Sequence, residues 1–213
     1  AANPLLSQTA VILLNPPTSG AYGAQTAVSA KLESEGLPLA NQTLSISLGQ
    51  ITRQAVTDGS GTVTVTLPIT ALPGRVDLRA TFAGTQDYAG SAAASPFDIV
   101  RQATSLVLEP ASATGYGENP ALMLATLSDA TGRRLSEETV IFVLTGEDGG
   151  ASIPALTDYA GRARLGGLSL PAGTYAVSAY FRGTFQLHTG ATVSIDDPRY
   201  LPASASGEVT LLN

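Results

Sequence analysis

Hydrophobic and polar residues alternate along this chain in short runs, which is the pattern of strands with one buried face. Valine and leucine alternate with threonine over 62–67, and apolar residues alternate with arginine, aspartate and threonine over 75–82. Side chains alternate between the two sides of a strand, so the apolar set is predicted to face inward and the polar set to face water. Gly, Pro, Asn and Asp end the runs, and helical periodicity is nearly missing.

Seven strands are predicted in each half of the chain. In the first half they span 9–14, 25–33, 43–49, 51–56, 61–68, 75–82 and 93–100. In the second half they span 104–109, 121–128, 139–145, 152–157, 161–166, 174–182 and 204–212. Short antiparallel strands with turns this frequent predict an all-β fold of immunoglobulin-like sandwiches. A closed barrel with the same number of strands is the structural alternative.

The two halves are copies of one module. Thr57-Asp58-x-x-Gly61 returns as Thr157-Asp158-x-x-Gly161, and Phe82-Ala83-Gly84-Thr85 returns as Phe181-Arg182-Gly183-Thr184. A period close to one domain length predicts two tandem domains, 1–101 and 102–213. About three residues join the last strand of the first copy to the first strand of the second. Such a short linker predicts a semi-rigid pair.

Composition narrows the classes of partner and location. Charged residues make up 13% of the 213 residues, about half of the usual share, which favours an extracellular β-module rich in Ser, Thr, Gly and Ala. The net charge of −6 and the single lysine, Lys31, argue against a nucleic acid partner. With no cysteine, the chain has no disulfide, thiolate zinc site or cysteine nucleophile.

Targeting signals are missing from the sequence. No apolar stretch approaches the roughly 20 residues that a membrane span needs. The start of the chain lacks the basic residues and apolar centre of a signal peptide, and it lacks an initiator methionine. We interpret the chain as an excised piece of a longer protein.

The order of the shared motifs resembles the bacterial Ig-like domain repeats over nearly all of 9–212. It runs Tyr-Gly, Asp-x-x-Gly, Leu-Pro-x-Gly-x-Tyr-x-Val-x-Ala and then Tyr-x-x-Ser. The first copy has Leu72-Pro73-Gly74-Arg75-Val76 and Tyr88, and the second has Leu170-Pro171-Ala172-Gly173 and Tyr200. Modules of that family occur in tandem in secreted and cell-surface proteins. The resemblance implies a spacer or adhesive role and carries over no catalytic residues.

The second copy carries an insertion at about 184–197. Three residues separate Gly84 from Tyr88, whereas sixteen separate Gly183 from Tyr200. Within the insertion, apolar residues alternate with polar ones on both sides of Thr189-Gly190. This pattern predicts a hairpin that extends the edge of the sheet.

The second copy also places apolar residues on an outer face. Ile141, Val143 and Tyr180 stand where the first copy has serine and threonine. An apolar patch of this kind is either covered or used. We expect the inserted hairpin, or an adjoining domain, to cover it. The alternatives are harmless exposure and a partner-binding face, which would also include three residues of the insertion: Phe185, Leu187 and His188.

Candidate catalytic and metal-binding residues are few. His188 lies near Asp196 and Asp197, but no Gly-x-Ser-x-Gly elbow accompanies it, so we expect an exposed loop histidine. The segment 58–61 resembles the start of a calcium loop without its later ligands, and we expect a turn there. A hairpin turn is expected at 147–150, with a weak cation site as the alternative. No catalytic residue, cofactor or metal site is therefore predicted.

Neither a lysine–asparagine cross-link nor glycoside hydrolysis is predicted. Some Ig-like surface modules cross-link a lysine to an asparagine across the core. Lys31 is the sole candidate here, and its alternation with Ala30 and Leu32 places it outward. Glycoside hydrolysis needs two acids that face a cleft, and nothing in the sequence places two acids together.

The sequence therefore predicts a non-enzymatic spacer or adhesion segment of a larger secreted or cell-surface bacterial protein. The flanking domains of that protein are its expected partners. One alternative is a protein- or glycan-binding module that uses the 184–197 insertion and the Ile141, Val143 and Tyr180 face. The other is an accessory module of an extracellular enzyme.

Overall fold

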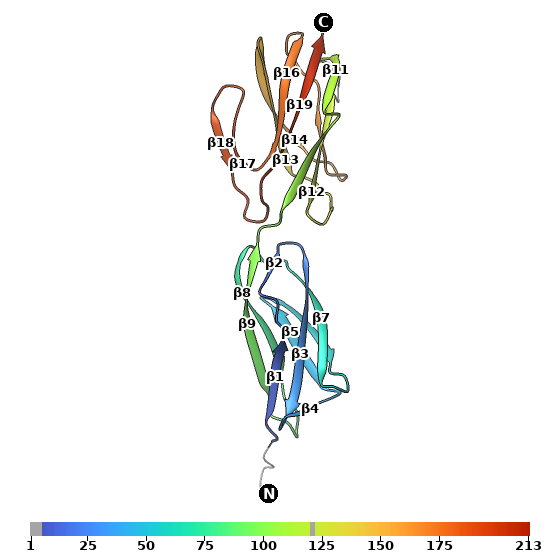
Figure 1. Cartoon of the computed structure of the whole chain (residues 1–213), viewed down its shortest axis with the longest axis vertical. Coiled ribbons are helices and arrows are strands. Elements are labelled where there is room, and N and C mark those ends of the chain that lie inside the picture. The colour runs from blue at the N-terminus through green and yellow to red at the C-terminus, as the bar shows by residue number, and fades with distance from the viewer. Residues whose placement is uncertain (1–5, 120–121) are drawn as a thin grey trace. The chain divides into compact units, whose positions relative to one another are not determined.

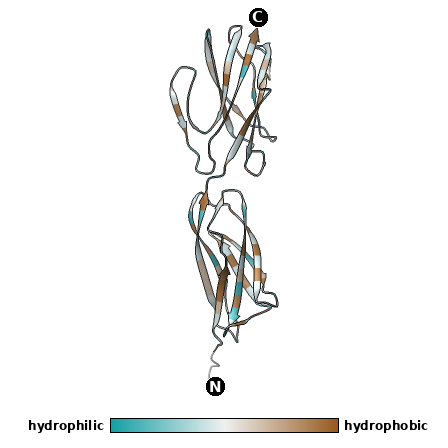
Figure 2. Ribbon diagram, viewed as in Figure 1, coloured by the Kyte–Doolittle hydropathy of each residue, from teal (hydrophilic) through white to brown (hydrophobic). Residues whose placement is uncertain are grey.

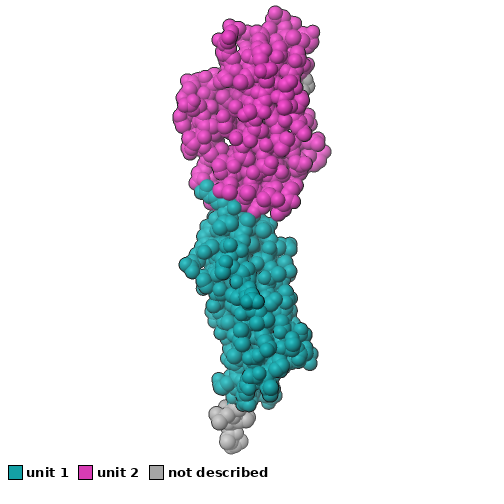
Figure 3. Space-filling view, in the orientation of Figure 1, with its two compact units in different colours: residues 1–101 teal, residues 102–213 magenta. Residues whose placement is uncertain are grey.

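The computed structural model describes residues 6–119 and 122–213. The chain divides into two compact units, residues 1–101 and 102–213 (Figure 3). Ala121, the first residue of one expected strand, lies outside the described residues.

Unit 1 consists of two sheets (Figure 1). Its strands are β1 (Thr9–Leu14), β2 (Ser19–Ala21), β3 (Gln25–Ser34), β4 (Leu37–Pro38), β5 (Thr43–Leu48), β6 (Ile51–Val56), β7 (Thr62–Pro68), β8 (Gly74–Phe82) and β9 (Ser91–Val100). One sheet joins β1, β3, β4 and β7, and β3 pairs with each of the other three. The other sheet has the order β2-β9-β8-β5-β6.

Unit 2 repeats this plan and adds a hairpin. Its strands are β10 (Thr104–Glu109), β11 (Ser112–Tyr116), β12 (Met123–Asp129), β13 (Thr139–Gly146), β14 (Gly149–Leu156), β15 (Arg162–Leu165), β16 (Gly173–Phe181), β17 (Gly183–Gln186), β18 (Thr192–Ile195) and β19 (Ala203–Leu212). The two main sheets have the orders β10-β12-β15 and β11-β19-β16-β13-β14, and β17 pairs only with β18.

The first segment of each unit contributes to both sheets. In unit 1, β1 pairs antiparallel with β3 and β2 pairs parallel with β9. In unit 2, β10 pairs antiparallel with β12 and β11 pairs parallel with β19. The predicted all-β, immunoglobulin-like sandwich is thus confirmed, and the two sheets of each unit do not join into a barrel among the described residues. The short strands β2, β4 and β11 were not predicted.

The predicted alternation produces a separate core in each unit. Hydrophobic and hydrophilic positions are interspersed along the strands (Figure 2). Residues on one side of each inner strand are buried, while their neighbours are more exposed. Burial of each large aliphatic or aromatic side chain contributes roughly 1.5–3 kcal/mol. The largest fully buried side chains are Leu32, Leu44, Ile46, Leu67, Ile69, Leu78 and Phe97 in unit 1, and Met123, Leu127, Phe142, Tyr175 and Phe181 in unit 2.

Separate cores predict separate unfolding. Phe97 of β9 is fully buried, so Phe97→Ala is expected to lower the free energy of unfolding of unit 1 by about 3–5 kcal/mol through lost contacts and a cavity. Amide NMR signals followed through a urea titration give the unfolding midpoint of each unit in one experiment. The signals of unit 2 should keep their midpoint, and a matched Val100→Ala change on the exposed side of β9 should leave both midpoints near their original values. A shared shift of both midpoints would contradict the prediction.

Candidate functional site: the covered face of unit 2

The predicted apolar residues lie together on the outer face of the larger sheet of unit 2. Ile141 of β13 pairs with Tyr180 of β16, and Val143 pairs with Ser152 of β14. Side chains alternate along β13, and Val140, Phe142 and Leu144 point into the core. Ile141 and Val143 therefore point away from it. Left in water, this face would expose a contiguous apolar patch.

The inserted hairpin covers this face. The ring of Phe185 in β17 stacks on the ring of Tyr180, with centroids 4.5 Å apart and planes 6° from parallel. Phe185 is 5% exposed and Val143 is 6% exposed, although both lie outside the sandwich core. Stacked aromatic pairs add to the free energy gained by burying their area. The expectation that the hairpin covers the apolar face is confirmed.

The hairpin has one polar face and one apolar face. Thr184 and Ser194 are cross-strand partners whose hydroxyl oxygens lie 3.0 Å apart on the exposed side. Phe185 and Val193 are partners on the other side. The predicted turn is present, because the Gly190 N–H donates to the Leu187 carbonyl at 2.9 Å and Gly190 has a φ of +81°.

One expectation about the hairpin is wrong. It was expected to extend the edge of the sheet, but β17 and β18 form a two-stranded sheet of their own. The chain leaves β16 through Arg182 and Gly183, which have φ values of +59° and +83°. Two successive left-handed residues turn the backbone sharply. Packing on the face buries Phe185 and Val143, which addition to the edge would leave in water.

The tip of the hairpin is attached to the edge strand β14. The His188 N–H donates to the Ser152 hydroxyl at 3.1 Å, and the His188 Nδ1 lies 2.9 Å from the same oxygen. The His188 side chain is otherwise exposed, as predicted for a loop histidine. Its hydrogen bonds fasten the tip to the sheet.

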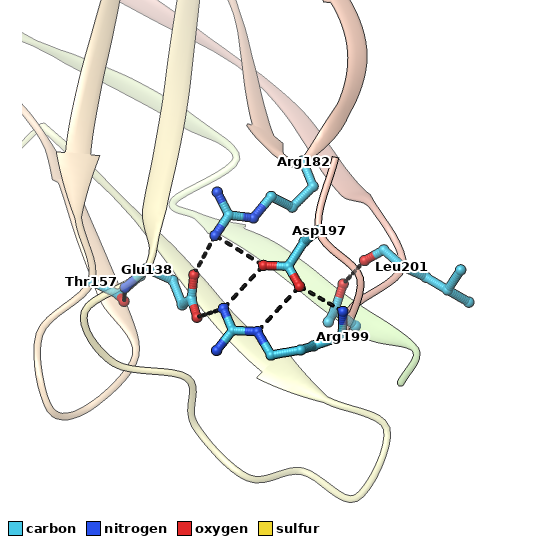
Figure 4. Close-up of polar contacts among 7 residues, drawn as sticks. Glu138, Thr157, Arg182, Asp197, Arg199 and Leu201 are labelled. Atoms are coloured by element: carbon cyan, nitrogen blue, oxygen red, sulfur yellow. Dashed lines mark hydrogen bonds and ion pairs between the residues drawn. The ribbon is translucent and has the colours of Figure 1, made fainter. Parts of the chain in front are cut away.

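The base of the hairpin is held by two arginines and two acids (Figure 4). The Arg182 Nη2 lies 2.7 Å from the Glu138 carboxylate and 3.3 Å from that of Asp197. The Arg199 Nη2 lies 3.0 Å from Asp197 and 3.4 Å from Glu138. Glu138 directly precedes β13, whereas the other three residues flank the hairpin. The network therefore ties both ends of the insertion to the sandwich.

Burial makes this network sensitive to charge. The Asp197 side chain is only 6% exposed. Burial alone would raise the pKa of the Asp197 carboxyl, but hydrogen bonds from the Arg199 side chain and backbone, with the charges of Arg199 and Arg182, outweigh it and lower that pKa. The hydrogen bond to Asp197 is the main cause that raises the pKa of Arg199. This network was not predicted from the sequence, although basic and acidic residues bracket the insertion.

The acids of the turns are engaged locally. The Asp58 carboxylate accepts hydrogen bonds from the N–H groups of Ser60 and Thr62, both at 2.9 Å. The Ser60 hydroxyl and these N–H groups hold the pKa of Asp58 below its ordinary value. Asp158 accepts from Ala160 and Arg162 in the same way. Both predicted turns are confirmed, and residues 147–148 connect β13 to β14 in a hairpin.

Two further candidate chemistries are a metal site and a cross-link at Lys31. Within 6–119 and 122–213, no group of three or more His, Cys, Asp or Glu residues is placed to hold a metal ion. Lys31 points outward, as predicted, and forms an ion pair with Glu33, while Ala30 and Leu32 are fully buried.

The six candidate binding residues come together around the hairpin. Val143 and Phe185 are buried, Ile141, Tyr180 and Leu187 are half-buried, and His188 is exposed. Binding of a partner by this set stays a prediction. In this arrangement, a partner would contact His188 and the exposed parts of the half-buried side chains.

No protein-family model matches the sequence, and no curated protein matches it. Solved structures match its fold. Invasin, a bacterial integrin-binding protein, is 19% identical over 96% of this chain and 39% of its own, with a TM-score of 0.46. A bacterial ice-binding adhesin is 16% identical over 98% and 67%, with a TM-score of 0.34. The fibronectin(III)-like modules of Clostridium thermocellum CbhA are 16% identical over 94% and 93%, with a TM-score of 0.32.

These are likenesses of fold at low sequence identity. This chain spans less than half of the invasin chain. In the part of the chain that the structure describes, no helix is long and apolar enough to cross a membrane.

The stacking of the hairpin predicts a large cost for Phe185→Ala. The change removes a buried ring that stacks on Tyr180, so the free energy of unfolding of unit 2 should fall by about 3 kcal/mol. Urea unfolding measures this value. Gln186→Ala, at the neighbouring exposed position, is the matched control and should cost less than about 0.5 kcal/mol. Equal effects of the two substitutions would contradict the covering role of Phe185.

The ion network predicts a dependence of stability on pH. Because the pKa of Asp197 is lower in the folded than in the unfolded chain, its charged form stabilises unit 2 above the unfolded pKa of about 4. That stability is lost as the pH falls through the folded pKa. Urea unfolding at pH 7 and pH 3 should show Asp197→Asn less stable than the parent at pH 7, with a smaller loss on acidification. An unchanged dependence on pH would contradict the assignment.

Proposed function

We propose that the chain is a non-enzymatic spacer or adhesion segment of a larger secreted or cell-surface bacterial protein. The observation that carries this proposal is the path of the backbone through each unit taken by itself. In each unit, the chain enters beside the start of the last strand and leaves at the end of that strand. The length of one sheet therefore separates the two points.

Unit 1 provides the first instance. The Ser7 N–H donates to the Asp87 carbonyl at 2.9 Å, shortly before β9 begins. The far end of β9 is Val100, which pairs with Ala21 of β2. The ten residues of β9 span about 33 Å at the usual rise of an extended strand.

Unit 2 follows the same path. The Gln102 N–H donates to the Arg199 carbonyl at 2.8 Å, shortly before β19 begins. The far end of β19 is Leu212, which pairs with Tyr116 of β11. A module that passes the chain from one end to the other adds length between whatever precedes and follows it.

The strand pairs also suit a chain under tension. A pull on the two ends of a unit runs along the parallel pairs β2–β9 and β11–β19. The hydrogen bonds of a pair pulled along its length are loaded together rather than one after another. Only residues 101–103 connect β9 to β10.

Composition supports the proposed location and the absence of catalysis. The low content of charged residues and the hydroxyl-rich outer faces fit a module outside the cell. Several acids are engaged in turns, as Asp58 and Asp158 are, or in the ion network, as Glu138 and Asp197 are. The resemblance to the bacterial Ig-like domain repeats points to the same role.

A second candidate is a binding module for a protein or a glycan. It is supported by the hairpin, which occurs only in the second copy and carries the exposed His188. Binding that is lost when 185–197 is deleted, in a glycan array or a pull-down, would favour this candidate over a spacer.

The spacer proposal predicts high and direction-dependent mechanical resistance. Pulled from its two ends, the chain should unfold in two steps, each releasing on the order of 300 Å of backbone. Because the chain has no native cysteine, Asp148→Cys offers a unique second attachment point. Asp148 and the C-terminus of β19 lie at the same end of unit 2, so a pull between them should peel strands apart at lower force. Single-molecule force spectroscopy measures both geometries, and equal forces would contradict the proposal.

A further inference from the structure

The larger sheet of each unit has an edge strand at either end. The longer of the two is β6 in unit 1 and β14 in unit 2, and each has a neighbour on one side only. An edge strand presents unpaired N–H and C=O groups, which can pair with a strand of another molecule. The two copies of the module protect this edge in different ways.

In unit 2 the edge is blocked by proline and by the hairpin. Pro154 lies within β14 and pairs with Ile141. Proline has no N–H, so β14 cannot offer a complete row of donors. The tip of the hairpin also bonds to this strand, through His188 and Ser152.

Unit 1 has neither feature, and its edge strand carries an arginine instead. Arg53 lies in the middle of β6 and pairs with Ile46, which is fully buried. Residues directly opposite each other share a face, so Arg53 lies on the inner face of the sheet. The equivalent position in unit 2, opposite Phe142, is occupied by Ile153. A charge thus stands where the other copy has an apolar residue.

Arg53 has no local partner that explains its presence. Among the described residues, its side chain forms no hydrogen bond or ion pair, and it is exposed at the open side of the sandwich. A charge that points inward on an edge strand is one of the ways in which proteins prevent strand pairing.

The register of β6 shows what a second copy would meet. Suppose that a second β6 pairs antiparallel with the first, and that the cores of both molecules lie on the same side of the joined sheet. Inner residues of one strand must then stand opposite inner residues of the other. Two registers satisfy this condition and pair five residues of each strand. One sets Arg53 opposite Arg53 of the second copy, and the other sets it opposite Ala55. In either case the two Arg53 side chains lie on the same face, at directly opposite or diagonal positions whose Cβ atoms are roughly 5–8 Å apart.

We propose that Arg53 keeps the β6 edge closed to a second copy of this chain. Like charges opposite each other disfavour pairing, and the added strand would also remove the charges from water. Without the charge, β6 becomes a self-complementary pairing surface of β-branched, polar and small residues, which suit a strand.

Sedimentation velocity over a series of concentrations tests the proposal. The parent should sediment as a single chain, and Arg53→Val should shift with concentration toward twice that mass. Arg79→Val is the matched control, because it makes the same change on the exposed face of the interior strand β8, and it should keep the mass of the parent. A single-chain mass for Arg53→Val at all concentrations, or equal association of the two variants, would overturn the proposal.

Two further variants test the cause and the place of the association. Arg53→Glu alone should remain a single chain, whereas an equimolar mixture with the parent should form dimers, because opposite charges then face each other. A mixture that stays at the mass of a single chain would overturn the role of charge. Adding Gln54→Pro to Arg53→Val should abolish association, and association that persists would place the contact outside β6.

Discussion

A two-layer sandwich buries only one face of each sheet, and the rest of this structure follows from that constraint. The outer faces and the edges are left to water, so they must be polar, charged or covered. Unit 1 satisfies the constraint with serine and threonine on its faces and with Arg53 on an edge. Unit 2 has apolar residues on an outer face, and it needs an additional element to cover them.

The inserted hairpin is that element, and two kinds of interaction hold it. Phe185 packs on Tyr180 by apolar contact, whereas Arg182 and Arg199 fix the base through Glu138 and Asp197. Apolar contact supplies the driving force for docking but does not select one orientation of the hairpin. The buried charges select the orientation, because any other one would leave charged groups unpaired away from water. Together they explain why an insertion of this length is ordered rather than a loose loop.

The sequence predicted what depends on neighbours along the chain. Inward positions, turns at Asp58 and Asp158, and the hairpin all follow from local alternation and turn chemistry. The strands β2 and β11 were missed because they are short, contain glycine and exist only through pairing with strands far along the chain. The ion network was missed for the same reason, since it joins residues from 138 to 199. Covering of the apolar face was predicted from the outward positions of Ile141, Val143 and Tyr180. That the hairpin forms a sheet of its own, instead of extending the edge, depends on the left-handed backbone at Arg182 and Gly183, which alternation does not reveal.

The most direct test of this account replaces 184–199 with 85–87, the short connection of the first copy, and measures the fluorescence of a dye that binds apolar surface. Unit 2 should still fold, since its core is complete without the hairpin, and dye binding should rise. Restoring the polar residues of the first copy, with Ile141→Ser, Val143→Ser and Tyr180→Thr, should return dye binding to the level of the parent. A shortened chain that folds and binds no more dye than the parent would contradict the account.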